Sequence, residues 1–414
     1  MRSPGAAART ILEDLQPLAP ERVALPDALG CVLAEDAKSP LDLPPWDNSA
    51  MDGYAVRGAD VQRAAGPVEL RVVEVIPAGR IPSHPLGPGE CARIFTGAPL
   101  PPGADGVIRQ EDTTALAGDR VRIDNPRDVG HNLRRRGEDI RRDSVPLERG
   151  TPLGPAQIGV LASLGMATVA VHRRPLVAIL GSGDEIADLA EAAAIREGKK
   201  IASSNTYTLL AGLTLAGARA RNLGIARDDP ADIARRVSGA RDADLLVTTA
   251  GISVGEHDHM RRVLEETGGR LTFWRIRMRP GAPVGYGRMA GVPWIGLPGN
   301  PVSTMVTFEL FVRPAVRKLL GHRTFFRRAV PVRVAEPLRF PAKLTHFLRA
   351  VVREEDGVRV ARLTGPQGSG ILTSMAKANA LLILPAERDE VAPGEALSAI
   401  LLDEPVHVAD PPFE

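Results

Sequence analysis

The feature that most constrains the fold is an alternation of strand-like and helix-like segments between residues 176 and 320. The strand-like runs are LVAIL, RARNLGI, ADLLVTT, LTFWRIRM and VPWIGL, and the helical segments lie at 204–216, 230–240, 257–267 and after Pro301. Such alternation indicates an open parallel sheet with helices on both faces, in which ligands bind beyond the carboxyl ends of the strands. We therefore expect a doubly wound α/β domain over 176–321 with a binding site at that edge.

The sequence on either side of this domain has a different character. Helical spacing over 6–18 and 27–35 gives way, between 48 and 139, to short strand-like pieces punctuated by Gly and Pro, which predict a small β-domain. Gly154 and Pro155 open a further helix, and short strands return over 322–414. The expected fold class is α/β plus β in a chain of several domains.

Charge and cysteine usage narrow the partners and the compartment. The 52 basic and 50 acidic side chains nearly cancel, and the basic clusters lack interleaved aromatic residues, so we expect no nucleic-acid partner. Cys31 and Cys91 form no CxxC, which argues against a thiolate zinc site or a disulfide framework and favours a reducing compartment. Glu13 and Asp14 interrupt any signal peptide, and no run of about 18 apolar residues occurs. The prediction is a cytoplasmic protein with no membrane partner.

Three Gly-rich turns follow three of the predicted strands, at 181–185, 250–258 and 298–303. Glycine lets a backbone approach a ligand closely, and free N–H groups at a helix start attract phosphate. Any one such turn alone is weak evidence, because it is more simply explained as a tight connection between a strand and a helix, and Asn300 before Pro301 is also an ordinary helix start. The candidate substrate-binding residues on these turns are Ser182, Gly183, Asp184, Gly251, Ser253, Gly255, Pro298, Gly299, Asn300, Pro301 and Ser303.

Carboxylates share these turns, at Asp184, Glu185, Glu256 and Asp258. A phosphate pocket crowded with carboxylates repels its ligand unless a hard cation bridges them, and oxygen-rich sites of this kind suit Mg²⁺. The pattern favours phosphate-ester or anhydride chemistry with Mg²⁺, and we expect Asp258 and Glu185 to hold the cation. We expect Glu256 only to cap a helix, and the histidines on either side of Asp258 to be solvated rather than bound to zinc.

Further motifs lie on both sides of the three turns, at 44–55 (PPWDNSAMDGYA), 93–99 (RIFTGAP), 134–139 (RRRGED), 367–370 (QGSG) and 378–380 (ANA). Together with the three turns, they make the sequence resemble, along essentially its whole length, the molybdopterin molybdenumtransferase family, the bacterial MoeA proteins and the E-domain of gephyrin. So many motifs in the same order are far more specific than any single turn.

The resemblance implies four parts: a discontinuous N-terminal domain (1–47 and 140–175), an inserted β-domain (48–139), a molybdopterin-binding α/β domain (176–321) and a C-terminal β-barrel-like domain (322–414), assembled as a homodimer. It implies that adenylyl-molybdopterin and molybdate give molybdenum cofactor and AMP with Mg²⁺. Other molybdenum cofactor synthesis proteins and apo-molybdoenzymes are the expected partners. The implied catalytic acids are Asp52, Asp139, Glu185 and Asp258, with Thr96 and Gly97 in substrate binding and Arg279, Arg349 and Ser369 in molybdate binding.

Two departures from the family pattern leave alternatives open. Arg279 and Ala282 stand where the family usually has the two lysines of Lys-Pro-Gly-Lys-Pro, and Ser203 replaces an aspartate. A tungstate preference, a weaker oxyanion site and a diverged function therefore remain open. The competing hypotheses are a molybdopterin adenylyltransferase-like enzyme, which makes the adenylate, and an inactive or scaffolding homologue.

Overall fold

The computed structural model describes residues 1–62, 66–250, 259–266 and 268–403. The chain divides into two compact units. The first comprises Met1–Arg22, Gly30–Ala34 and Ala170–Glu414, and the second comprises Val23–Leu29 and Glu35–Val169. Among the described residues, none of the helices has both the length and the apolar character needed to span a membrane.

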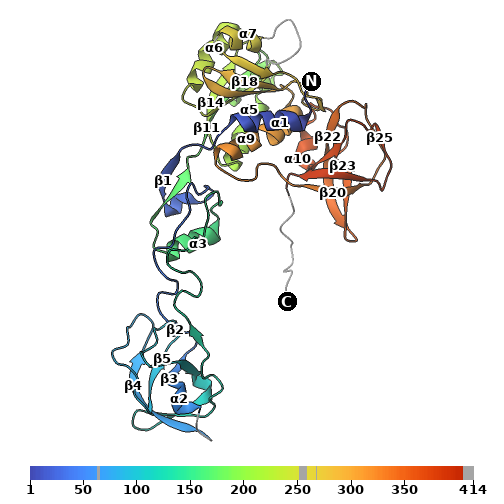
Figure 1. The fold of residues 1–414 in the computed structure, drawn as a ribbon. Helices are drawn as coiled ribbons and strands as arrows, with labels where there is room; N and C mark the ends of the chain where they lie inside the picture. The colour runs from blue at the N-terminus through green and yellow to red at the C-terminus, as the bar shows by residue number, and fades with distance from the viewer. Residues whose placement is uncertain (63–65, 251–258, 267, 404–414) are drawn as a thin grey trace. The chain divides into compact units, whose positions relative to one another are not determined.

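A six-stranded sheet forms the centre of the first unit, with the order β14-β11-β15-β19-β18-β16 (Figure 1). The strands are β11 (Leu176–Ser182), β14 (Arg219–Ala226), β15 (Leu245–Thr249), β16 (Arg270–Phe273), β18 (Gly285–Met289) and β19 (Val292–Leu297). Strands β14, β11, β15 and β19 are parallel to one another. The expected edge, where parallel strands end side by side, is therefore present in the four-stranded part of the sheet that carries the Gly-rich turns.

The other two strands of the sheet show that the prediction of a fully parallel sheet is wrong. Strand β18 is antiparallel to β19, and β16 is antiparallel to β18. Met289 pairs with Val292 across a two-residue turn in which Ala290 and Gly291 both have positive φ. A two-residue turn of this kind joins only antiparallel strands. The segment LTFWRIRM is also not one strand, because Met278–Arg279 forms β17 in a different sheet.

Helices cover both faces of the sheet, as predicted. Val177 and Ile179 of β11 lie in one apolar cluster, and the alternate residues Ala178 and Leu180 lie in another. The first cluster includes α1 (Pro4–Asp14), α5 (Ser204–Leu215), α8 (Pro301–Thr307), the π-helical segment η5 (Phe308–Val312) and α9 (Arg313–Leu319). The second includes α6 (Pro230–Val237) and α7 (His259–Glu266). This arrangement confirms the doubly wound α/β fold.

A closed β-barrel follows the α/β domain in the same unit. Its strands are β20 (Ala329–Val334), β22 (Thr345–Glu355), β23 (Val358–Leu363), β24 (Ala380–Leu384) and β26 (Ala396–Leu401). Because β22 pairs with both β23 and β24, the sheet closes on itself, which confirms the barrel-like C-terminal domain. Helix α10 (Leu372–Lys377) lies between β23 and β24 in the chain, and a short sheet pairs β21 (Leu338–Arg339) with β25 (Glu390–Val391). Strand β17 pairs with β22 and so attaches the barrel to the α/β domain.

The second unit contains another six-stranded sheet, with the order β6-β3-β5-β4-β8-β7. Its strands are β3 (Gly53–Val56), β4 (Val68–Ile76), β5 (Glu90–Ile94), β6 (Gly106–Arg109), β7 (Thr113–Leu116) and β8 (Arg120–Ile123). The unit also holds β2 (Asn48–Ser49), α2 (Gly58–Val61), the 3₁₀ turn η2 (Gln110–Asp112), β9 (Leu133–Arg134) and α3 (Pro155–Ser163), while β1 (Pro20–Ala24) and β10 (Thr168–His172) carry the chain between the units. The second helix predicted at 27–35 is only a 3₁₀ turn, η1 (Leu25–Ala28), because Gly30 with φ +76 leaves the helical conformation.

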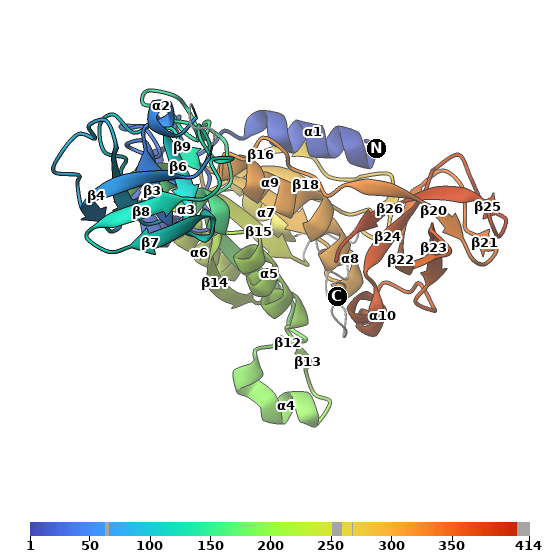
Figure 2. The ribbon, with the colours of Figure 1, turned by 90° about the horizontal axis from the view of Figure 1, so that it is seen from below.

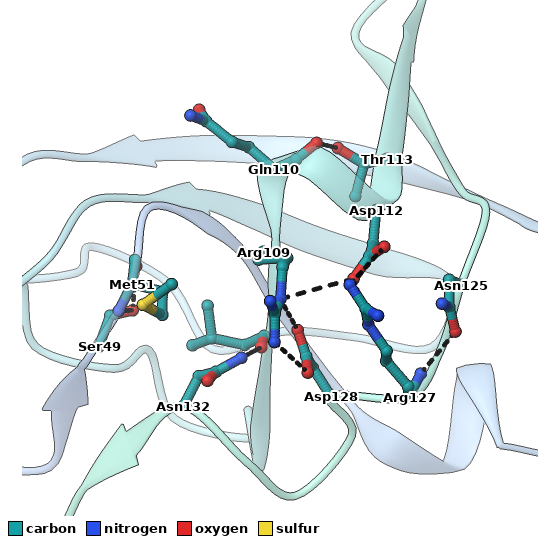
Figure 3. Close-up of polar contacts among 11 residues, drawn as sticks. Ser49, Met51, Arg109, Gln110, Asp112, Thr113, Asn125, Arg127, Asp128 and Asn132 are labelled. Carbon is teal, nitrogen blue, oxygen red and sulfur yellow. Dashed lines mark hydrogen bonds and ion pairs between the residues drawn. The ribbon is translucent and has the colours of Figure 1, made fainter.

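An ion-pair network fixes the end of β6 in the second unit (Figure 3). Arg109 Nε lies 2.7 Å from Asp128 Oδ2 and 3.5 Å from Asp112, and Arg127 Nε lies 2.8 Å from the same Asp112 carboxylate. The bond from Arg109 lowers the pKa of the buried Asp128. Asn132 donates to the Val107 carbonyl at 3.0 Å, so the segment that leads into β9 is held to β6 by side chains.

Candidate functional site

A cavity of about 470 Å³ lies where β11, β15 and β19 end. Six of the residues predicted from the sequence line it, namely Ser182, Glu185, Pro298, Gly299, Asn300 and Pro301. Three others on the same turns, Gly183, Asp184 and Ser303, are not among its lining residues. The cavity is also lined by residues that were not predicted from the sequence, among them Asn205, Thr249 and Pro283.

The first turn separates two adjacent carboxylates. Gly183 has φ +133, which favours glycine, and a Cβ there lies only 2.8 Å from the Glu185 carboxylate. The Asp184 carboxylate accepts a hydrogen bond from the Asp228 N–H at 3.3 Å, beyond the end of β14. Glu185 therefore lines the cavity, whereas Asp184 is held at the neighbouring strand end.

The other two turns bring backbone close to the cavity. Ala250 has φ +66, and a Cβ built on Gly299 lies 3.2 Å from the Ala250 Cβ, so only glycine fits there without displacing a neighbour. Asn205 Nδ2 donates to the Gly299 carbonyl at 2.7 Å, and Thr304 Oγ1 donates to the Pro298 carbonyl at 2.7 Å. These bonds fix the third turn from both sides.

An excursion of the chain between Glu185 and Ser203 supplies an apolar part of the cavity. Short parallel strands β12 (Ile186–Ala187) and β13 (Ile201–Ala202) flank a 3₁₀ turn, η3 (Leu189–Glu191), and helix α4 (Ala192–Arg196), and Figure 2 shows this excursion projecting from the sheet. Ile186 and Ile201 line the cavity. The cavity therefore combines an apolar wall with polar strand ends, a composition typical of small-molecule sites.

The C-terminal domain reaches the third turn through Ser369. Its Oγ accepts a hydrogen bond from Asn300 Nδ2 at 3.0 Å, and its carbonyl accepts one from the Val302 N–H at 3.1 Å. Arg349 is fully buried behind this contact, and burial lowers its pKa. Its Nη2 donates to the Gly368 carbonyl at 3.0 Å. Arg279, the third residue predicted for molybdate, is exposed on β17, whose register pairs it with His346 of β22.

Four of the predicted residues belong to the second unit. Asp52 Oδ1 accepts hydrogen bonds from the Thr96 N–H and hydroxyl, both at 2.8 Å, and these bonds lower the Asp52 pKa. Gly97 follows with φ +83. Asp139 is exposed, and its N–H donates to the Leu43 carbonyl at 3.1 Å. The structure thus joins Asp52 directly to Thr96, and the cavity lies in the other unit.

Several predicted residues fall outside the described residues. These are Gly251, Ser253, Gly255, Glu256, His257 and Asp258. Within the described ranges, no group of three or more His, Cys, Asp or Glu side chains is arranged to hold a metal ion. Glu185 is the sole carboxylate among the described residues that line the cavity.

Comparison with known proteins identifies the family. The chain matches, in order, models of the MoeA N-terminal region (domain I and II) at residues 2–165, a probable molybdopterin binding domain at 178–318 and the MoeA C-terminal region (domain IV) at 331–402. Molybdopterin molybdenumtransferase 2 of Mycobacterium tuberculosis is 36% identical over 96% of this chain and 98% of its own length. The chain belongs to the molybdopterin molybdenumtransferase family.

Other members of the family agree. The molybdopterin molybdenumtransferase of a Nostoc species is 36% identical, with 92% of this chain and 88% of that protein covered. A crystal structure of the molybdopterin biosynthesis moeA protein from Pyrococcus horikoshii superposes with a TM-score of 0.82 at 29% identity, covering 97% of this chain and 100% of that one. The resemblance seen in the sequence is confirmed, and the chain is an enzyme of molybdenum cofactor biosynthesis.

Proposed function

We propose that this molybdopterin molybdenumtransferase uses adenylyl-molybdopterin and molybdate, and that metal transfer is accompanied by release of AMP in an Mg²⁺-dependent reaction. The observation that carries the proposal is the cavity at the ends of β11, β15 and β19, in the region that matches the molybdopterin binding domain. The closely approaching backbone at Gly299 suits a phosphate, and the apolar wall at Ile186 and Ile201 suits a flat ring.

The chemistry of the cavity fits a hard cation. Its described lining contains no lysine or arginine, so a bound phosphoanhydride meets the Glu185 carboxylate without a positive side chain to offset it. Oxygen donors are present in Glu185 and in the hydroxyls of Ser182, Ser204 and Thr249, and Mg²⁺ prefers such ligands together with substrate phosphates. We propose that Glu185 and Asp258 hold Mg²⁺, which neutralises phosphate charge when bound.

The oxyanion is proposed to bind on the C-terminal side of the cavity, through Arg279 and Ser369, while Arg349, which is fully buried, holds the loop that carries Ser369. The contact between Ser369 and Asn300 supports this placement, because Asn300 lines the cavity. The hydroxyl of Ser369 and the exposed guanidinium of Arg279 are groups that suit a tetrahedral dianion.

We also propose that the protein is a cytoplasmic homodimer and that it transfers its product to apo-molybdoenzymes. Asp52, Thr96 and Asp139 lie in a different unit from the cavity. Cys31 and Cys91 are buried and form no disulfide with each other, which supports a reducing compartment. Sedimentation that finds an active monomer at micromolar concentration contradicts the dimer.

The deciding experiment supplies purified adenylyl-molybdopterin with and without molybdate, and follows AMP release and activation of an apo-molybdoenzyme. AMP release and activation that both require molybdate and Mg²⁺ support the proposal. Formation of adenylate and pyrophosphate from Mg-ATP and molybdopterin supports the adenylyltransferase alternative instead. If neither reaction occurs, the result supports an inactive or scaffolding homologue.

A further inference from the structure

The barrel of the C-terminal domain supplies hydrogen-bond partners to the start of helix α8. Asn300 precedes this helix, but its side chain makes no cap bond to the helix backbone. It donates instead to Ser369 Oγ, while the Ser369 carbonyl accepts from the Val302 N–H, one of the donors that a helix start leaves without an internal partner. The loop at 365–370 therefore caps α8 at the edge of the cavity.

Gln367 fastens this loop to strand β22. Its Oε1 accepts a hydrogen bond from the Arg349 N–H at 2.8 Å, and its Nε2 donates to the Arg349 carbonyl at 3.1 Å and to the Gly365 carbonyl at 2.9 Å. Strand β23 pairs with β22 as far as Ala350 and Leu363. Beyond this pair the Thr364 N–H still donates to the Arg349 carbonyl at 3.0 Å, and the Arg349 N–H has Gln367 as its acceptor. The carboxamide of Gln367 thus binds both backbone groups of Arg349, as a residue of a partner strand does.

The Arg349 side chain holds the next residue of the same loop. Its Nη2 donates to the Gly368 carbonyl, and its Nε donates to Ser374 Oγ at 3.0 Å. Two consecutive loop residues, Gln367 and Gly368, are therefore tied to a single residue of the barrel, immediately before Ser369. Only a side chain with both a donor and an acceptor makes the bonds of Gln367.

We propose that Gln367 is a positioning residue, which holds the 365–370 loop so that Ser369 meets Asn300 and Val302 at the cavity. The expected effect of Gln367 on turnover rests on the proposed function, in which Ser369 binds the oxyanion. Its effect on the loop and on α8 rests on the contacts alone.

The test compares Gln367→Leu with Thr364→Val. Thr364 Oγ1 also donates to the Arg349 carbonyl, at 3.3 Å, but lies before the loop, so its loss controls for a missing bond at the same acceptor. Hydrogen exchange by mass spectrometry should show roughly tenfold faster exchange over 366–371 and 301–304 in Gln367→Leu, the factor expected when hydrogen bonds of ordinary strength are lost. Thr364→Val should stay within about twofold of the wild type in both segments.

Steady-state kinetics supply the second readout. In Gln367→Leu the molybdate KM should rise by about the same factor while kcat at saturating molybdate is retained. If Gln367→Leu does not fold, Gln367→Glu replaces it, since it keeps the acceptor for the Arg349 N–H and loses both donated bonds.

Unchanged exchange over 301–304, or equal exchange in the two variants, overturns the positioning role. Faster exchange with an unchanged molybdate KM overturns its connection to the reaction. Exchange needs no substrate, so a wild type that releases no AMP refutes the proposed function and still leaves the positioning role under test.

Discussion

Replacing Gly299 by alanine adds one methyl group where β15 and β19 end. An ideal Cβ there lies 3.2 Å from the Ala250 Cβ, closer than ordinary van der Waals contact. Ala250 has φ +66, a narrow conformational region for a residue with a side chain, so its backbone has little freedom to move away. Overpacking of this kind costs about 1 kcal/mol or somewhat more in the free energy of unfolding.

The larger effect is expected on the substrate. A phosphate kept away from the backbone by this methyl group forfeits at least one charge-assisted hydrogen bond, worth about 1.5–3 kcal/mol, so kcat/KM for adenylyl-molybdopterin should fall roughly ten- to a hundredfold. The assay is AMP release at saturating molybdate, with urea unfolding measured in parallel to show that the variant is folded.

Gly159→Ala is the matched control for this substitution. Gly159 is exposed within helix α3, and a Cβ there meets nothing within 4 Å. Alanine should stabilise that helix by about 0.5–1 kcal/mol and leave AMP release unchanged. A folded Gly299→Ala protein with the wild-type kcat/KM refutes the argument that substrate approaches the backbone at Gly299.

Three further predictions concern the metal, the core and pH. Glu185→Gln should raise the Mg²⁺ concentration for half-maximal AMP release at least about tenfold, and wild-type Mg²⁺ dependence speaks against Glu185 as a ligand. Trp294 Nε1 donates to the buried Thr248 Oγ1 at 3.0 Å. Trp294→Phe should therefore lower the free energy of unfolding by about 1–3 kcal/mol, and the added substitution Thr248→Val should recover part of that loss. A double variant that is no more stable than Trp294→Phe in urea titrations contradicts the role of this hydrogen bond. The pKa of Asp232 is lowered from 3.8 to about 2, chiefly by the hydrogen bond from the Arg227 N–H and then by the side chains of Arg236 and Arg235. This carboxylate therefore stabilises the fold above about pH 4, and the stabilisation is lost as the pH falls toward 2. The difference in urea midpoint between wild type and Asp232→Asn should shrink over that range, and a constant difference disproves the assignment.

The sequence predicted the parts of the fold whose periodicity is local. LVAIL, ADLLVTT and VPWIGL are buried parallel strands because continuous apolar runs suit strands covered on both faces. Strand β18 was missed because GYGRM has two glycines and an arginine in five residues, a composition depleted in strands, and its place is set by the tight turn into β19. Pairing between β17 and β22 joins segments far apart in the chain and leaves no local signal.

The site was predicted less completely, for a similar reason. Adjacent Asp184 and Glu185 are indistinguishable by composition, and the backbone at Gly183 decides which one enters the cavity. Asn205 was not selected, although its position at a predicted helix start after a strand was a usable signal. The contact between Asn300 and Ser369 depends on how the barrel packs on α8, which no spacing in the sequence encodes.

A crystal structure of the protein with AMP and Mg²⁺ tests most directly whether the adenylate binds where β11, β15 and β19 end. We expect the phosphate of AMP to lie against the strand ends at Ser182, Thr249 and Gly299, with Mg²⁺ on the Glu185 carboxylate. Well-ordered AMP bound outside this cavity, with Glu185 free of metal, contradicts it.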